Sequence, residues 1–363
     1  MDKKRFYDDR LKYLSFIQNT NEKSKISEEI YPFIKALPKN KTYIKVLDAG
    51  TGDGTIKSNL IKSFHKYHPN TSLIITGKEI SYEDLKNTLD KMPDRFIEHP
   101  NLMVSMTNVR FSEISQIGNS NKIKNKNINV FNLVLKNNNS FDFNNQITEL
   151  EGFIKKNWGI KISKKGRTSY SHPCLIRIYR ADHKKYFEPL MNKENETSNY
   201  DFIIASQAYR AASDVGIKAS NVIKPLINLL AKPGKLFITH SCGSDTVEKI
   251  LKLAWKDKDP FPNKAQDLID FLKNGNLEKG SKYYFSKPKK YNFKYKKTPD
   301  ETISELFGYG VESKWANILY VGQVPEKDIN EVEKKPIIIK KVKNAILKED
   351  IFFNNEMFTI KKV

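Results

Sequence analysis

The sequence predicts an α/β fold in which helices cover both faces of a mostly parallel sheet. Short apolar runs alternate with segments of helical period over residues 41–117 and again over residues 198–255. Such alternation is typical of βαβ units, which build parallel sheets. Three closely spaced glycines directly follow the first apolar run, as expected where a strand turns into a helix beside a ligand.

The predicted elements of the first part follow from these periods. They are helices within 1–40, the strand Ile44–Ala49, the helix Thr55–Tyr67, the strand Ser72–Glu79, the helix Ser81–Lys91 and the strand Leu102–Thr107. We expect residues 1–40 to form an N-terminal helical cap or lid. The core is assigned to 41–117 and 197–363.

An inserted segment, 118–196, interrupts the alternation between the third and fourth core strands. Its first part, 118–145, is rich in Asn and Lys, one helix is expected at Gln146–Ile160, and a strand is expected at Cys174–Tyr179. A strand there would place Arg177 and Tyr179 on the same face. Two roles stay open for the insertion, a cap over the active site or an arm for a homodimer.

Alternation resumes at Tyr200. The expected strands are Tyr200–Ser206, Lys235–His240, Lys282–Tyr295 and Met357–Lys362, with a tight turn at Pro233–Gly234. The expected helices are Asn221–Leu230, Thr246–Trp255, Ala265–Lys273, Pro299–Phe307, Lys314–Val321 and Asp328–Leu347.

Composition excludes several classes of protein. The chain is 39% hydrophobic and 11% aromatic, which is too much for a disordered chain. No run approaches the roughly 20 apolar residues of a membrane span, and the N-terminus has no secretory signal. Two cysteines give neither a disulfide framework nor a zinc spacing, so we expect a cytoplasmic protein without a metal. The net charge of +21 suits a general basic surface, a polyanion partner or an anionic substrate.

The glycine cluster lies in VLDAGTGDGTIKSNLI, residues 46–61. A dinucleotide fingerprint, G-x-G-x-x-G, would need glycine at Thr55, but the third glycine is Gly54. The pattern D-x-G-x-G-x-G resembles the first motif of class I S-adenosylmethionine (SAM) methyltransferases. That resemblance implies a Rossmann-like seven-stranded sheet, SAM as the cofactor and S-adenosylhomocysteine as its product. A Rossmann-like domain for another nucleotide remains the alternative.

The resemblance also implies roles for individual residues. Asp48 would organise the loop and receive the ammonium of the cofactor, and Glu79 would accept its ribose hydroxyls. Thr107 and Asn108 would lie beside the adenine. The complete expected cofactor set is Asp48, Gly50, Thr51, Gly52, Gly54, Glu79, Thr107, Asn108, Ser206 and Gln207.

Further segments bear on the chemical class of the group that accepts the methyl. No [D/N]-P-P-[Y/F/W] motif and no Pro-Cys pair follows the fourth strand, which argues against adenine or glutamine N-methylation and cytosine C5-methylation. YDFIIASQAYRAASD (200–214), NTNEK (19–23) and the final FFNNEMFTIKKV resemble the histamine N-methyltransferase family. This resemblance implies Glu22 and Gln207 as substrate contacts, with Tyr13 and Phe16 as lid aromatics. It does not name the substrate.

Methyl transfer is an in-line displacement, so the protein mainly aligns the acceptor and excludes water. A base is needed only if the acceptor arrives protonated, and His240 is the candidate, with a structural role as the alternative. Tyr209 and Arg210 follow the fourth strand, at the edge where ligands of open sheets bind. Arg210 suits a carboxylate or phosphate on the substrate, or a surface ion pair.

Three functions are consistent with the sequence. The first is methylation of an N, O or S atom of a small molecule. The second is methylation of RNA or protein, suggested by the basic run Lys287–Lys297, in which Tyr291, Phe293 and Tyr295 alternate with other residues. The third is a non-catalytic SAM-binding scaffold.

Overall fold

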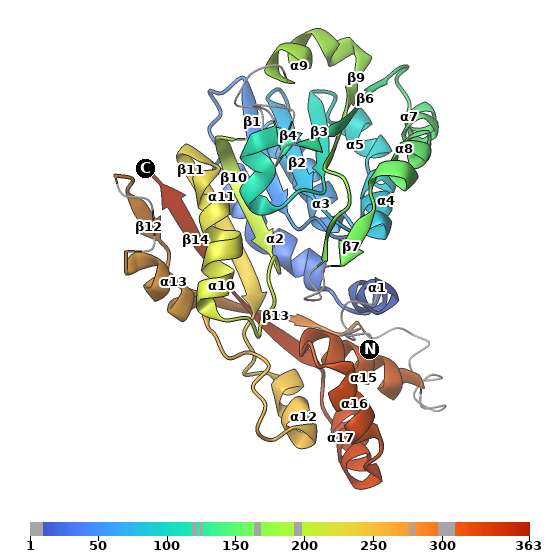
Figure 1. Ribbon diagram of the computed structural model, residues 1–363, viewed down its shortest axis with the longest axis vertical. Helices are drawn as coiled ribbons and strands as arrows, with labels where there is room; N and C mark the ends of the chain where they lie inside the picture. Colours follow the sequence, from blue (N-terminus) through green and yellow to red (C-terminus); the bar gives the residue numbers. More distant parts are fainter. Residues whose placement is uncertain are drawn as a thin grey trace.

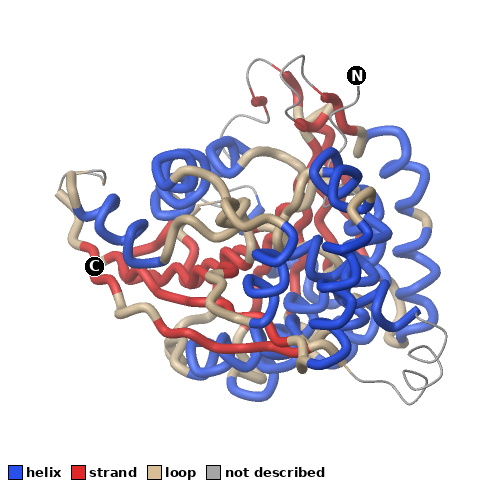
Figure 2. Tube along the Cα trace, turned by 90° about the horizontal axis from the view of Figure 1, so that it is seen from below, coloured by secondary structure: helices blue, strands red, loops and turns tan. Residues whose placement is uncertain are grey.

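Apolar and polar periods of the sequence become strands and helices in the predicted order, and the α/β class is confirmed. The computed structural model describes residues 10–117, 122–123, 126–162, 168–191, 198–275, 277, 280–296 and 309–363. One sheet crosses the molecule between helical layers (Figures 1 and 2).

The main sheet has ten strands rather than the seven expected. They are β1 (Tyr43–Ala49), β2 (Ser72–Lys78), β3 (Leu102–Thr107), β6 (Asn129–Leu135), β9 (Cys174–Arg180), β10 (Tyr200–Ser206), β11 (Leu230–Ser241), β12 (Tyr283–Phe285), β13 (Lys289–Lys294) and β14 (Phe352–Lys362). The insertion supplies two of the additional strands, β6 and β9. The third arises because one expected strand, Lys282–Tyr295, is two strands separated by Pro288, which cannot donate to a ladder.

The strand order is β12-β14-β11-β10-β1-β2-β3-β9-β6, and β13 also pairs with β14. β1, β2, β3, β10 and β11 run parallel, whereas β14 is antiparallel to β11 and β9 is antiparallel to β3. The chain leaves β1 toward β2 and β3 and later returns to β10 on its other side. The carboxyl ends of β1 and β10 therefore form a topological switch point, where open α/β sheets bind ligands. Two short ladders lie apart from the sheet: β4 (Lys122–Ile123) with β5 (Lys126–Asn127), and β7 (Ile160–Ile162) with β8 (Thr168–Tyr170).

Alternate strand residues point to opposite helical layers. Ile44 and Val46 belong to the core beneath α2 (Glu22–Lys35), α3 (Thr55–Tyr67), α4 (Tyr82–Asp90), α5 (Pro93–Glu98), α7 (Ser140–Thr148) and α8 (Leu150–Asn157). Leu47 and Ala49 belong to the core beneath η2 (Phe111–Gln116), α10 (Val215–Lys218), η4 (Ala219–Ile223), α11 (Lys224–Asn228) and α13 (Ala265–Lys273). η3 (Ala181–His183) and α9 (Lys184–Met191) follow β9, and Phe187 of α9 packs on Tyr179.

A third group of helices gathers at the carboxyl ends of the parallel strands (Figure 1). It consists of α1 (Arg10–Asn19), α12 (Thr246–Ala254), α15 (Tyr309–Val321), α16 (Glu326–Glu333) and α17 (Pro336–Lys348). Its core includes Phe16, Ile318, Phe293 and Phe353, so β13 and β14 connect this group to the sheet. No helix within the described ranges is long and apolar enough to cross a membrane.

Several predicted boundaries are wrong. The expected helix Gln146–Ile160 is two helices, α7 and α8, and α7 begins earlier because Asn139 caps it at Asp142 N. The expected helix Asp328–Leu347 is α16 and α17, which are separated before Pro336 because a proline disfavours helical geometry in the preceding residue. The helix expected at Asn221–Leu230 begins at Val215 and ends at Asn228, and β11 begins at Leu230. The helix expected at Pro299–Phe307 lies outside the described residues.

Candidate functional site

The glycine loop joins β1 to α3 at the switch point. Gly50, Gly52 and Gly54 all have positive φ, of 92°, 58° and 79°. A Cβ at Gly54 would lie 2.7 Å from Thr88 Cα, so this turn requires glycine both for its dihedral angle and for its packing on α4. Thr51 N donates to Lys78 O at 3.0 Å, which fixes the loop to the end of β2.

Glu79 links the end of β2 to the glycine loop. Its Oε2 accepts from Gly52 N at 2.8 Å, and its Oε1 accepts from Ile80 N at 2.8 Å and Ser81 N at 2.9 Å. The carboxylate is 6% exposed. Two residues of the expected cofactor set are thus brought into direct contact, and the loop is held in place by a buried negative charge.

Asp48 and Lys57 are both buried and attract each other electrostatically. Asp48 Oδ2 and the nearby Ser206 Oγ are buried and lack hydrogen-bond partners among the described residues. Burial raises the pKa of Asp48 despite the attraction of Lys57. Burial also lowers the pKa of Lys57 to about 8, although Asp48 and Glu79 attract its charge. A Cβ at Gly77 would lie 2.0 Å from Lys57 Nζ, so this glycine makes room for the ammonium.

Thr107 and Asn108 connect β3 to the inserted strand β9. Thr107 Oγ1 donates to Cys174 O at 2.8 Å. Asn108 Nδ2 donates to His172 O, and its Oδ1 accepts from Cys174 N, both at 2.9 Å. The polar groups expected beside the adenine are therefore engaged with the insertion in this structure.

Glu22 and Gln207, the two expected substrate contacts, lie side by side. Gln207 Nε2 is 3.3 Å from Glu22 Oε1, 3.2 Å from Ser241 Oγ and 3.2 Å from Asn355 Oδ1. Tyr291 extends this polar cluster, since its Oη lies 3.4 Å from Asn355 Nδ2. Gln207 has a φ of 51°, which is uncommon for a residue other than glycine and is found at functional sites.

The expected lid aromatics, Tyr13 and Phe16, are both on α1 and occupy different positions. Phe16 is 2% exposed and stacks on Tyr320 of α15 at 5.1 Å between ring centroids. Tyr13 reaches the glycine loop: a Cβ at Gly52 would lie 2.1 Å from its hydroxyl oxygen. In this structure Tyr13 therefore contacts a residue of the expected cofactor set.

His240, the candidate base, is 1% exposed and has a partner on each ring nitrogen. Its Nδ1 lies 2.7 Å from Tyr209 Oη, and its Nε2 lies 3.0 Å from Glu356 Oε1. Burial lowers the pKa of His240 although Glu356 opposes this effect. Tyr209 and Arg210 are half-buried in the loop after β10.

The aromatic residues of the basic run Lys287–Lys297 contact other residues of the protein. Tyr291 Oη lies 2.7 Å from Thr239 Oγ1. Phe293 is fully buried and stacks on Phe353 at 4.7 Å. Tyr295 Oη donates to Ser313 Oγ at 3.0 Å. The alternation of aromatic residues in this run therefore serves packing within the protein.

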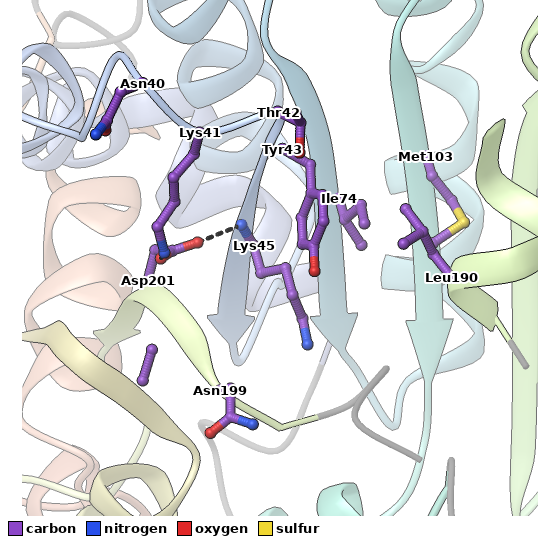
Figure 3. Close-up of a pocket in the computed structure, with 11 residues that line it drawn as sticks. Asn40, Lys41, Thr42, Tyr43, Lys45, Ile74, Met103, Leu190, Asn199 and Asp201 are labelled. Atoms are coloured by element: carbon purple, nitrogen blue, oxygen red, sulfur yellow. Dashed lines mark hydrogen bonds and ion pairs between the residues drawn. The ribbon is translucent and has the colours of Figure 1, made fainter. Parts of the chain in front are cut away.

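A cavity of about 520 Å³ lies at the opposite edge of the sheet, near the amino ends of the parallel strands (Figure 3). Tyr43 and Lys45 of β1, Met103 of β3 and Leu190 of α9 contribute to its wall. At this cavity Asp201 accepts a hydrogen bond from Lys45 N at 2.8 Å and forms an ion pair with Lys41. None of the expected site residues lines this cavity. The polar and charged residues of the expected site lie instead at the switch point, at the carboxyl ends of the strands.

Sequence reasoning missed five residues of the site. They are Lys57, Ser241, Tyr291, Asn355 and Tyr320. Lys57 had a detectable signal, because it shares the buried helical stripe of Leu60, Ile61 and Phe64. The others come from distant segments that only the folded chain brings together.

No protein-family model and no curated protein matches the chain. Among solved structures, the 4+2 cyclase SpnF is 10% identical, with 92% of this chain and 80% of that chain covered and a TM-score of 0.38. A geranyl diphosphate methyltransferase solved with GPP and sinefungin is 7% identical, with 93% and 77% covered and a TM-score of 0.36. A SAM-dependent methyltransferase from Archaeoglobus fulgidus is 11% identical, with 94% of each chain covered and a TM-score of 0.31.

The topology itself assigns the fold. A mostly parallel sheet reverses its strand order between β1 and β10, and the glycine loop lies at that point. The core therefore has a Rossmann-like α/β fold. The fold alone does not determine the reaction.

Proposed function

We propose that the protein is a SAM-dependent methyltransferase that acts on a small molecule. The bond from Gly52 N to Glu79 Oε2 carries this proposal, because it joins the glycine loop to an acid at the end of the adjacent strand. Asp48 and Ser206 suit the cofactor as well, since each has a buried oxygen that lacks a partner in the described structure. When bound, SAM supplies a methyl group on a positively charged sulfur.

The residues of this chain would divide the work. Glu79 and Asp48 would hold hydroxyl and ammonium groups of the cofactor, and the loop backbone would lie beneath it. Glu22 and Gln207 would orient the acceptor, while Phe16 of α1 and Tyr320 of α15 would exclude water. His240 reaches the site through Tyr209, so it would position this hydroxyl or exchange a proton with it.

An amine is the acceptor that this site favours. Glu22 is a carboxylate that is only 3% exposed. The Gln207 amide offers two N–H groups to three nearby acceptors, which leaves acceptor capacity for a donor on a ligand. Lys23 Nζ, at 3.3 Å from Glu22, partly neutralises this charge. An amine that donates hydrogen bonds through its N–H groups and keeps a free lone pair for the methyl group is complementary to this arrangement.

Calorimetry with SAM and S-adenosylhomocysteine tests cofactor binding, with Asp48→Asn and Glu79→Gln as site variants. Labelled-methyl transfer into size-fractionated cell extract then tests the acceptor. We expect binding by the wild-type protein, weaker binding by both variants and label in low-mass products. Absence of binding would refute the proposal, and label confined to macromolecules would replace the acceptor class. Binding without transfer would favour a scaffold.

A further inference from the structure

The first turns of α1 lie on the glycine loop. Tyr13 is 8% exposed, and a Cβ at Gly52 would be 2.1 Å from its hydroxyl oxygen and 3.3 Å from Cζ. The tyrosine therefore occupies space directly above the one loop glycine whose backbone N–H binds Glu79.

Arg10 lies one turn before Tyr13 and reaches two acids, Glu79 after β2 and Asp84 in α4. It forms an ion pair with Asp84 of α4, and its Nη2 lies 3.7 Å from Glu79 Oε1. The Asp84 side chain has no exposed area. Burial, together with repulsion from Glu79, raises the pKa of Asp84 to about 7. Arg10 thus supplies positive charge to two buried acids, and Tyr13 covers the adjacent Gly52.

The two ends of α1 are held differently. Its second half packs through Phe16 on Tyr320 and Phe353, and Thr20 forms a bridge with Tyr295. The first half contacts the loop through Tyr13, whose ring centroid also lies 6.1 Å from that of Tyr320, and it contacts the acids through Arg10. Leu11 lies between them and is 77% exposed. Lifting of the first half would therefore break the contacts of Tyr13 and Arg10 and leave those of Phe16 in place.

We propose that the first half of α1 is a gate over the cofactor loop, which Tyr13 and Arg10 hold shut and which the entering cofactor displaces. The inference rests on the proposed function. Opening exposes Gly52 and removes a positive charge from Glu79 and Asp84. SAM carries positive charge and hydroxyl donors. Its groups therefore replace the positive charge of Arg10 beside Glu79 and Asp84. Gate closure and cofactor binding are then competing states of the same surface.

Calorimetric titration of the full chain with SAM and S-adenosylhomocysteine tests the gate. Tyr13→Phe removes only the hydroxyl, Arg10→Met removes the charge, and Leu11→Ala is the matched control on the same turn. If the closed state is about 90% populated, its loss tightens the apparent Kd by about tenfold. We expect tighter binding for Tyr13→Phe and Arg10→Met, and an unchanged Kd for Leu11→Ala.

Hydrogen exchange supplies a second measurement. We expect the amides of α1 to exchange faster when SAM is added to the wild-type protein, and faster without ligand in Arg10→Met. Equal or weaker binding by both variants, or protection of α1 by SAM, would overturn the gate alone. Absence of cofactor binding by the wild type and by every variant would overturn the proposed function, and the gate with it.

Discussion

Gln207 Nε2 lies 3.3 Å from Glu22 Oε1, although 185 residues separate them in the chain. Gln207 directly follows β10 at the switch point, and Glu22 begins α2, which packs on the sheet beside it. The contact joins the helical N-terminal region to the core at the edge where ligands bind.

Glu22→Gln tests the acceptor site. The variant keeps the shape of the side chain but removes its charge, and a hydrogen bond to a charged group contributes about 1.5–3 kcal/mol. We expect kcat/KM for the low-mass acceptor to fall by about 10- to 100-fold, with the Kd for SAM unchanged. Glu28→Gln, on an exposed position of α2, is the control. A parallel loss of SAM affinity would assign Glu22 to the cofactor instead.

Glu79→Gln tests the acid at the end of β2. Loss of its charge should weaken SAM binding by about tenfold or more, because charge-assisted hydrogen bonds are about twice as strong as neutral ones. Calorimetry measures the change, and Glu83→Gln, an exposed residue in the first turn of α4, controls for surface charge. Unaltered affinity in the Glu79 variant would remove this residue from the cofactor site.

Gly54→Ala tests the geometry of the loop. The φ of 79° and the 2.7 Å approach to Thr88 Cα should make this substitution destabilising by more than about 1 kcal/mol. Gly152→Ala, where a Cβ meets no atom within 4 Å on α8, should instead stabilise by about 0.5–1 kcal/mol. Chemical denaturation measures both values, and equal effects would contradict the assigned conformation.

Lys57→Met tests the buried ammonium through the pH dependence of stability. The folded protein releases the Lys57 proton near pH 8 and the unfolded chain near pH 10.5, so wild-type stability should rise between these values. The shift corresponds to roughly 3 kcal/mol. In Lys57→Met this part of the rise should disappear. Identical slopes for the two proteins, measured by denaturation at pH 8 and pH 10, would show that the ammonium is not desolvated.

His240→Gln separates proton transfer from positioning. The depressed pKa of His240 implies a stabilising contribution above about pH 6.5, which is lost as the pH falls through its folded value. If His240 only positions Tyr209, Tyr209→Phe should reproduce the loss of methyl transfer, and the pH–rate profile of both variants should keep its shape. Disappearance of an ionisation from the kcat profile of His240→Gln alone would instead assign proton transfer to the histidine.

Several strands and helices of the core could be predicted from local pattern. Thr55–Tyr67, Leu102–Thr107, Tyr200–Ser206 and Ala265–Lys273 have the boundaries that their periods predict. These segments have one strong apolar period with clear end signals. Pro288 and Pro336 each separate two elements that the apolar pattern predicts as one. The pattern also predicts the insertion, but it does not place the two strands of the insertion in the main sheet.

The sequence by itself determined the glycine loop and the acid that follows the second strand, because these signals lie in short segments whose spacing reflects backbone chemistry. Glu22 and Gln207 followed only from the resemblance to the histamine N-methyltransferase family. Only the tertiary structure decided that Asn355 and Ser241 join Gln207, that Asn108 holds β9, and that Tyr13 covers Gly52. Those contacts join residues far apart in the chain. Their geometry depends on how helices and strands pack, which no local spacing specifies.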